Sequence, residues 1–214
     1  ANVSSTVSLW PGSAGAMYGF RRELAGSGQW MRLLAPVSVA GGLVGAVLLL
    51  RTPSRVFASI VPFLILFATI LFAVQEPLTR RLQSDPGASS ERVRSSRWWV
   101  GAMVFQFFVA IYGGYFGAGI GILMLAALGV LGLTDIHQMN GLKNFFAVCI
   151  NVVAASYFAL RGTVDWRYTA IMVAGAIAGG YGGAGLARRL GRRFVRLAVV
   201  VIGLAMAASL LFKR

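Results

Sequence analysis

The chain has 214 residues, of which 57% are hydrophobic and only 12% are charged. A soluble domain is closer to half apolar and a quarter charged, so this composition excludes an ordinary soluble fold. The formal net charge is +14, but Lys and Arg cluster in short joints between long apolar runs, where they set membrane topology. The sequence therefore predicts an all-α polytopic protein of the lipid bilayer, with no nucleic-acid partner.

Charged joints divide the chain into apolar runs, which are the expected helices. A run that crosses a hydrocarbon core of ~30 Å needs ~20 helical residues with few charges. The first run is only moderately apolar, and the fourth is long and interrupted by Gly113 and Gly114. In chain order the runs are residues 3–20, 33–50, 56–74, 98–133, 140–160, 166–187 and 194–212.

A repeated pattern divides the chain into two parts. The sequence A-G-G-x-x-G-A-x-L-x-x-R-x-x-x-R occurs at residues 40–55 and again, 138 residues later, at 178–193. We therefore expect two homologous repeats, 1–76 and 98–214, joined by a basic polar loop at 77–97. In this register the opening part of the second repeat has no counterpart, so the first repeat is expected to be N-terminally incomplete.

The arginines predict how the repeats face. The joints at 21–32, 80–97 and 188–196 are the most basic, and the positive-inside rule places such joints in the cytoplasm. All three lie inside only if residues 98–133 cross twice or enter and leave on one side. The two repeats are then inverted, with a broken or re-entrant glycine-rich segment, as in many secondary transporters.

The first candidate binding segment is Y-G-G-Y-F-G-A-G-I-G at residues 112–121. Each glycine weakens a helix by about 1 kcal/mol relative to alanine, and unwound backbone in lipid must face protein or a water-filled cavity. Free N–H groups at a half-helix N-terminus would attract an anion. A tightly packed glycine-rich helix is the open alternative. The glycines concerned are Gly113, Gly114, Gly117, Gly119 and Gly121.

The second candidate is the start of the span that follows. Lys143 and Asn144 lie about one turn inside an apolar helix, where an ionisable residue is a functional candidate. Snorkelling of the lysine to the headgroups is the open alternative. Together with Asn140, these side chains would suit an anionic substrate. The repeat register places Ser5 and Thr6 at the matching positions of the first repeat.

Other small and polar residues are interpreted as packing positions. Gly41 and Gly45 form a small-xxx-small pair, as do Gly42 and Ala46, and such pairs let helix backbones approach closely. The intramembrane amide of Gln106 is expected to make an interhelical hydrogen bond. No cluster of metal ligands and no nucleophile–base set is visible in the sequence, so we expect neither an enzyme nor a bound metal or cofactor.

These motifs resemble a known family. Residues 112–124 and 135–144 are similar to the second-half signature of the sulfite exporter TauE/SafE family of bacterial membrane proteins, and residues 4–12 resemble the matching first-half element. The resemblance implies a multi-pass inner-membrane protein that exports small sulfur-containing anions such as sulfite or sulfonates. The chain departs from the family because its first half lacks the usual opening glycine-rich, proline-containing segment.

We therefore expect a transporter that works by alternating access, with one repeat rocking against the other. The anion would lie between the glycine-rich segment, the helix start at 140–144, and Ser5 with Thr6. A passive anion or solute channel and a non-transporting structural subunit stay open as alternatives. The sequence leaves open the substrate, a coupling proton or other ion, the direction of transport and whether the protein forms a homo-oligomer.

Overall fold

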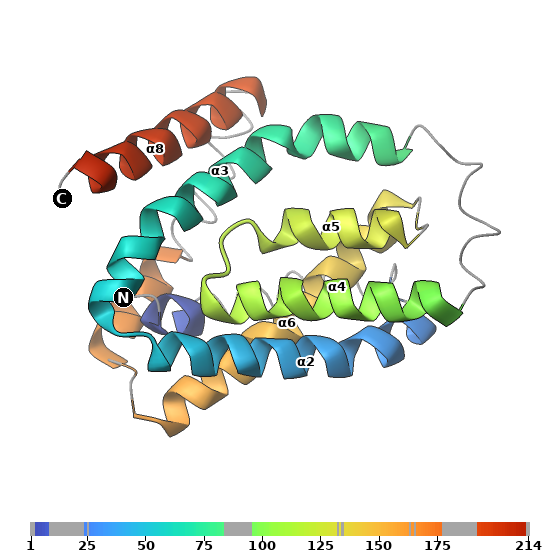
Figure 1. Ribbon diagram of the computed structural model, residues 1–214, viewed down its shortest axis with the longest axis horizontal. Helices are drawn as coiled ribbons and strands as arrows, with labels where there is room; N and C mark the ends of the chain where they lie inside the picture. The colour runs from blue at the N-terminus through green and yellow to red at the C-terminus, as the bar shows by residue number, and fades with distance from the viewer. Residues whose placement is uncertain are drawn as a thin grey trace.

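The computed structural model describes residues 3–8, 24, 26–83, 96–131, 133, 135–162, 164, 166–176 and 192–212. Within these ranges all regular secondary structure is helical, as the sequence predicts. Residues 3–8 and 166–176 form two of the helices. The others, shown in Figure 1, are α2 (Gly28–Arg51), α3 (Ser54–Gln83), α4 (Ser96–Tyr115), α5 (Ile120–Val130), α6 (Ile136–Leu160) and α8 (Arg192–Phe212).

Three helices in the described part of the chain are long and apolar enough to cross a membrane. They are Gly28–Arg51, Ser54–Val74 and Ile136–Leu160. Large apolar side chains are also exposed on the outside of the bundle, for example Phe63 at 57% and Phe108 at 63%. Such a surface suits lipid better than water. The chain is a multi-pass membrane protein.

Helices α2 and α4 lie side by side and run in the same direction, and α6 crosses them obliquely; the three form the centre of the bundle (Figure 1). At their starting ends, the rings of Trp30 on α2 and Trp99 on α4 lie 5.0 Å apart. At the same end, the Gln138 amide of α6 donates a hydrogen bond of 2.9 Å to the hydroxyl of Ser27, just before α2. These contacts fix the register of the three helices.

Glycines allow these three helices to approach at backbone distance. A Cβ on Gly41 would lie 2.7 Å from the Phe107 carbonyl oxygen of α4, and one on Gly42 would lie 3.1 Å from Cα of Ile150 on α6. A Cβ on Gly45 would meet the carbonyl oxygen of Ile111. The predicted packing role of these small residues in α2 is therefore confirmed.

A buried polar pair also joins α2 to α4. The Gln106 amide donates a hydrogen bond of 2.9 Å to the Ser38 hydroxyl, and the two side chains are 1% and 0% exposed. The expected interhelical hydrogen bond is therefore present. Around it, an apolar core joins α2, α4, α5 and α6, with members that include Leu34, Ala110 and Phe146.

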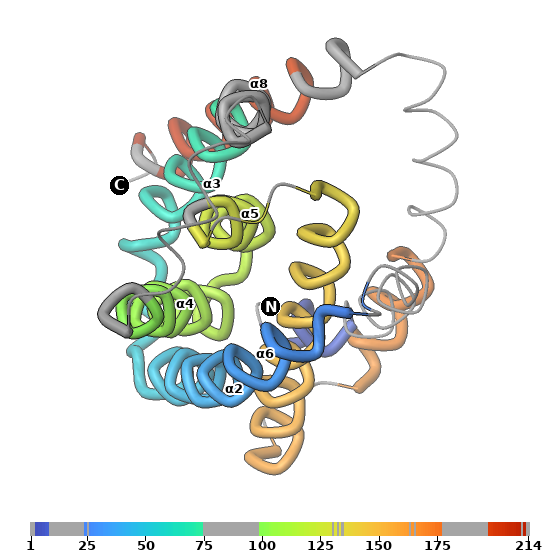
Figure 2. The backbone as a smooth tube through the Cα atoms, turned by 90° about the vertical axis from the view of Figure 1, so that its right-hand side faces the viewer, coloured from blue at the N-terminus to red at the C-terminus, as the bar shows by residue number. Residues whose placement is uncertain are grey.

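Helix α3 covers the other side of α5, and α8 packs on α3; both arrangements are visible in Figure 2. Gly203 of α8 lies against the side chain of Thr69 of α3. Because α3 continues to Gln83 and α4 begins at Ser96, the polar loop expected at 77–97 was predicted too long at both ends. Hydropathy shows where the bilayer ends, whereas good helix formers such as Leu, Arg and Gln continue the helix into water.

The second copy of the repeated pattern lies almost entirely outside the described residues. The two homologous, inverted repeats therefore stay a prediction. The path of residues 98–133 belongs to the same prediction, which expects them to cross twice or to return to the side of entry. The structure describes this path.

Candidate functional site

The segment between residues 98 and 133 forms a helical hairpin. Helix α4 ends at Tyr115, and α5 runs back beside it for 11 residues, ~16 Å. Because α6 starts beside Ser27, the hairpin begins and ends at the end of the bundle where α2 begins. The chain thus returns to its end of entry, as expected, and the side of the membrane on which this end lies stays a prediction.

The turn of the hairpin lies within the depth of α2. Tyr115, the last residue of α4, packs against Gly45, which is six residues before the end of α2, or ~9 Å. Gly117 has φ +79° and Gly119 has φ +77°, and this left-handed region strongly favours glycine. The helical segment is thus broken at these two glycines, as expected of a glycine-rich segment, and the depth of the break in the membrane stays a prediction.

The predicted position of the break was wrong. Gly113 and Gly114 were expected to interrupt the helix, but both lie inside α4. A Cβ on Gly113 would meet the side chain of Ile120, and one on Gly114 would meet the carbonyl oxygen of Gly42. These two glycines allow helices to pack closely, and a role in substrate binding stays a prediction for them.

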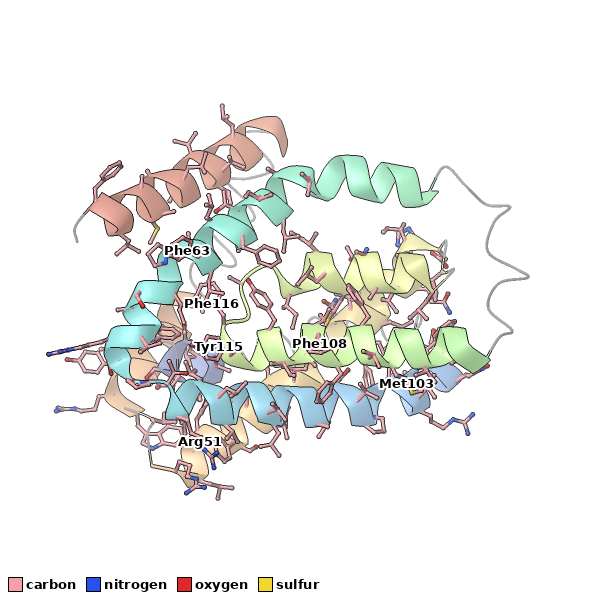
Figure 3. The ribbon with its side chains drawn as sticks, viewed as in Figure 1. Arg51, Phe63, Met103, Phe108, Tyr115 and Phe116 are labelled. Carbon is pink, nitrogen blue, oxygen red and sulfur yellow. The ribbon has the colours of Figure 1, made fainter. Side chains whose placement is uncertain are left out.

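Aromatic side chains of α3 and α4 close over the turn. The Tyr112 hydroxyl donates a hydrogen bond of 2.6 Å to the carbonyl of Ala118, which satisfies one of the non-helical carbonyls in the turn. The ring of Phe67 on α3 packs edge-on against Tyr112 at 5.6 Å. In Figure 3, Tyr115 and Phe116 lie at this end of α4, at the same end of the bundle as Arg51.

Lys143 lies seven residues after the start of α6, ~10 Å along the helix. Its side chain is half-buried, and its ammonium donates a hydrogen bond of 2.9 Å to Oδ1 of Asn140. The Asn140 amide donates to the carbonyl of Ile136 at 2.8 Å. Asn140 is therefore oriented by the backbone and holds the lysine through its oxygen.

Gly121 brings the start of α5 against this lysine. A Cβ on Gly121 would lie only 3.2 Å from Cδ of Lys143, so the stem of the lysine lies along protein rather than along lipid. The N–H groups of Ile120 and Ile122 donate to the carbonyls of Gly117 and Gly119. The Gly121 N–H, between them, has no acceptor among the described residues. The start of α5 thus lies against the stem of Lys143.

A helix cap beside this site was not predicted. Asp135 precedes α6, and its carboxylate accepts a hydrogen bond of 2.8 Å from the His137 N–H. The sequence carried the signal, since Asp directly before an apolar helical run is a preferred N-cap. Both side chains are exposed. Within the described ranges, no group of three His, Cys, Asp or Glu could hold a metal ion.

Comparison with known proteins identifies the family. The sequence matches the sulfite exporter TauE/SafE family over residues 1–210. The chain belongs to this family. It is 28% identical over 175 residues to a protein of Haemophilus influenzae described as a probable membrane transporter protein, covering 80% of this chain and 64% of that one.

A second relative is a Sinorhizobium protein described as probable membrane transporter protein ORF9. The chain is 27% identical to it over 178 residues, which cover 83% of this chain and 65% of the relative. The chain thus spans just under two thirds of the length of both curated relatives. No solved structure matches this TauE/SafE family member.

Ser5 and Thr6, the predicted partner residues of the first repeat, belong to a helix that packs further along α6 than Lys143. Ser5 and Thr6 belong to the helix at residues 3–8, whose Val3 and Val7 pack on a cluster that includes Ala154 of α6. Ala154 is eleven residues beyond Lys143, or ~16 Å along the helix. The predicted site residues therefore lie at two heights along α6 in this family member. Binding of one anion by Ser5 and Thr6 together with Lys143 stays a prediction.

The residues that the structure brings together are thus a subset of those predicted. Gly121, Asn140 and Lys143 form one contact group, and Gly117 with Gly119 shapes the turn that presents Gly121. Asn144 is half-buried beside Lys143 in sequence. Its polar side chains include one cation, Lys143, and anion binding by this group stays a prediction.

Proposed function

We propose that this TauE/SafE family protein is a secondary transporter of a bacterial inner membrane that exports small sulfur-containing anions, such as sulfite and sulfonates. The proposal depends chiefly on one observation, the lysine held inside a membrane helix against the broken hairpin. The family and its curated relatives support the class of activity. The family description supports the substrate class.

The positive charge of Lys143 has a neutral side chain as its polar partner in the described part of the chain, which supports an anionic substrate. A charged side chain within a span is costly unless it is paired or hydrated. In the described part of the chain its polar partner is Asn140, a neutral amide that accepts one of its three hydrogens. An entering oxyanion would supply the missing opposite charge and accept hydrogen bonds from the ammonium and from the Gly121 N–H.

The hairpin supports a moving carrier. Its turn depends on two left-handed glycines rather than on a continuous helix, and broken helices at mid-membrane sites are common in transporters that alternate between two open states. We propose that the anion binds where α5 begins and that one half of the molecule rocks against the other. A proton or another ion would couple the export.

Transport by Lys143 variants tests this proposal. Purified protein in liposomes would be supplied with radiolabelled sulfite or methanesulfonate, and flux would be measured against concentration with and without a pH gradient. Lys143→Met should lower kcat/KM for the anion about 10- to 100-fold, as expected for loss of a hydrogen bond from a charged group. Lys143→Arg should keep part of the activity.

Arg161→Met is the matched control. Arg161 lies just after α6, is exposed, and stacks over the ring of Tyr157 at 5.4 Å, so its loss removes a positive charge elsewhere on the same helix. Unchanged flux in Lys143→Met would remove Lys143 from the mechanism. Flux that rises linearly with concentration would indicate a channel, and folded protein without binding or flux would indicate a structural subunit.

A further inference from the structure

An open hollow lies at the other end of the molecule from the turn of the hairpin. Its volume is about 490 Å³, and it is lined by Gln29, Arg32, Leu33 and Trp99. These residues come from the first turns of α2 and α4, which run side by side from this end. The hollow is therefore at the end of the bundle where both helices begin.

The lining of the hollow combines a free cation with an aromatic wall. Arg32 is exposed, and its Nε donates to the carbonyl of Gly28 at 3.3 Å, which orients the guanidinium. Both Nη groups are without an acceptor among the described residues. Trp99 is supported from behind by Trp30, with the rings tilted by 38°. Tryptophans at this position are typical of the headgroup region.

Exposed apolar side chains follow one face of α4, beginning at the residue after Trp99. Val100, Val104 and Phe108 are spaced four residues apart and are 52%, 49% and 63% exposed, so they lie on one face of the helix. A headgroup in the hollow would thus have its acyl chains directed along this stripe. A free phosphate would use the cation and leave the stripe without a role.

We propose that this hollow binds one molecule of an anionic phospholipid, with its phosphate on the Nη groups of Arg32 and its acyl chains along α4. Among the described residues that line the hollow, Arg32 is charged and none is acidic, so a negative headgroup is favoured over a zwitterionic one. The arginine distribution places this end in the cytoplasm, where anionic lipids attract basic groups by about 1 kcal/mol per Lys or Arg. The site is separate from Lys143 and does not depend on the proposed transport.

Lipid binding to the purified protein tests the proposal. Native mass spectrometry in a mild detergent would count bound phosphatidylglycerol for the wild type, for Arg32→Gln and for Arg51→Gln. Arg51 is an exposed arginine at the opposite end of α2, and in Figure 3 it lies at the far end from Met103, one turn from Trp99. Arg32→Gln should weaken phosphatidylglycerol binding about fivefold or more, and Arg51→Gln should leave it unchanged.

Two further arms identify the ligand. Phosphatidylcholine should bind the wild type more weakly than phosphatidylglycerol does, and inorganic phosphate in excess should not displace the lipid. Equal binding of the two lipids, equal binding by Arg32→Gln and the wild type, or displacement by phosphate would each overturn the proposal. Trp99→Phe, which keeps an aromatic ring, provides a second variant that should weaken binding less than Arg32→Gln.

Discussion

Gly113 and Gly114 lie shortly before Gly117 and Gly119 in the sequence, yet the two pairs have different roles. The first pair stays helical and lets α4 lie against α2 and against the start of α5. The second pair has φ of +79° and +77° and turns the chain back from α4 into α5. Gly113 and Gly114 are needed because they lack a Cβ and so leave room for a neighbouring helix. Gly117 and Gly119 are needed because glycine can adopt a positive φ.

This difference shows how a glycine-rich segment can be rigid and broken at once. Glycine in a helix costs about 1 kcal/mol relative to alanine, and close interhelical contact offsets this cost at Gly114. At Gly119 nothing restores the helix, since its nearest neighbours are Cα and Cβ of Ala68 at 3.5 Å, an ordinary contact. Substitutions at the two pairs should therefore have separable effects on stability and on transport.

The largest effect on stability is expected for Gly114→Ala. The added Cβ would meet the carbonyl oxygen of Gly42. Because that oxygen is a backbone atom and cannot rotate away, α2 and α4 would have to move apart. We expect a loss of about 3 kcal/mol, at the upper end of overpacking effects, measured by unfolding in mixed detergent micelles with tryptophan fluorescence.

Gly101→Ala is the control for that measurement. Gly101 lies in the same helix, is exposed, and has nothing within 4 Å of an added Cβ. It should gain stability by about 0.5–1 kcal/mol, because alanine is the better helix former. Equal stability of the two variants would show that close contact between α2 and α4 is not what Gly114 provides.

Gly119→Ala should lower stability less than Gly114→Ala does, and its main effect should be on transport. An alanine in the left-handed region costs about 1–2 kcal/mol. Gly162, which follows α6, has φ +63° and open space around it, so Gly162→Ala carries the same backbone strain away from the hairpin. Both variants should lose similar stability in the micelle assay.

Flux in liposomes then distinguishes the two positions. Gly119→Ala should lower transport of the labelled anion severalfold beyond its effect on folded protein, since Gly119 presents the start of α5 to Lys143. Gly162→Ala should transport as the wild type does. If both variants transported equally well, the turn of the hairpin would have no part in the anion pathway.

Hydropathy predicted the helices that cross the membrane because the bilayer itself imposes their length. The run at 33–50 corresponds to α2, which ends where Thr52 and Pro53 stop it. The local pairing of Asn140 with Lys143 was also within reach of the sequence, since residues three apart share a helix face. Both features depend on neighbours in the chain.

The position of the break depends on distant segments, which is why the sequence misplaced it. Whether a glycine turns or packs is decided by what occupies its Cβ position, and for Gly114 this is the carbonyl of Gly42, 72 residues earlier. The contact of Gly121 with Lys143 is likewise tertiary. Matching Ser5 and Thr6 to Lys143 and Asn144 through the repeat gave equivalent positions but could not give a distance between them.

The smallest effect is expected for the polar contact at the same α2–α4 interface. If glycine-mediated approach holds the two helices together, the hydrogen bond from Gln106 to Ser38 should add little to stability. Gln106→Met, Ser38→Ala and the double variant form a cycle whose coupling we expect to be about 0.6 kcal/mol, the average for such bonds in membrane helices.

The same unfolding assay in micelles measures this cycle. Gln106→Met alone should cost more than the coupling, because the Ser38 hydroxyl, at 0% exposure, loses its interhelical partner. A coupling near 3 kcal/mol would mean that the Gln106–Ser38 hydrogen bond contributes as much to stability as the glycine contacts do. The polar pair, rather than the glycine contacts, would then be the main attachment between α2 and α4, and Gly114→Ala should prove correspondingly mild.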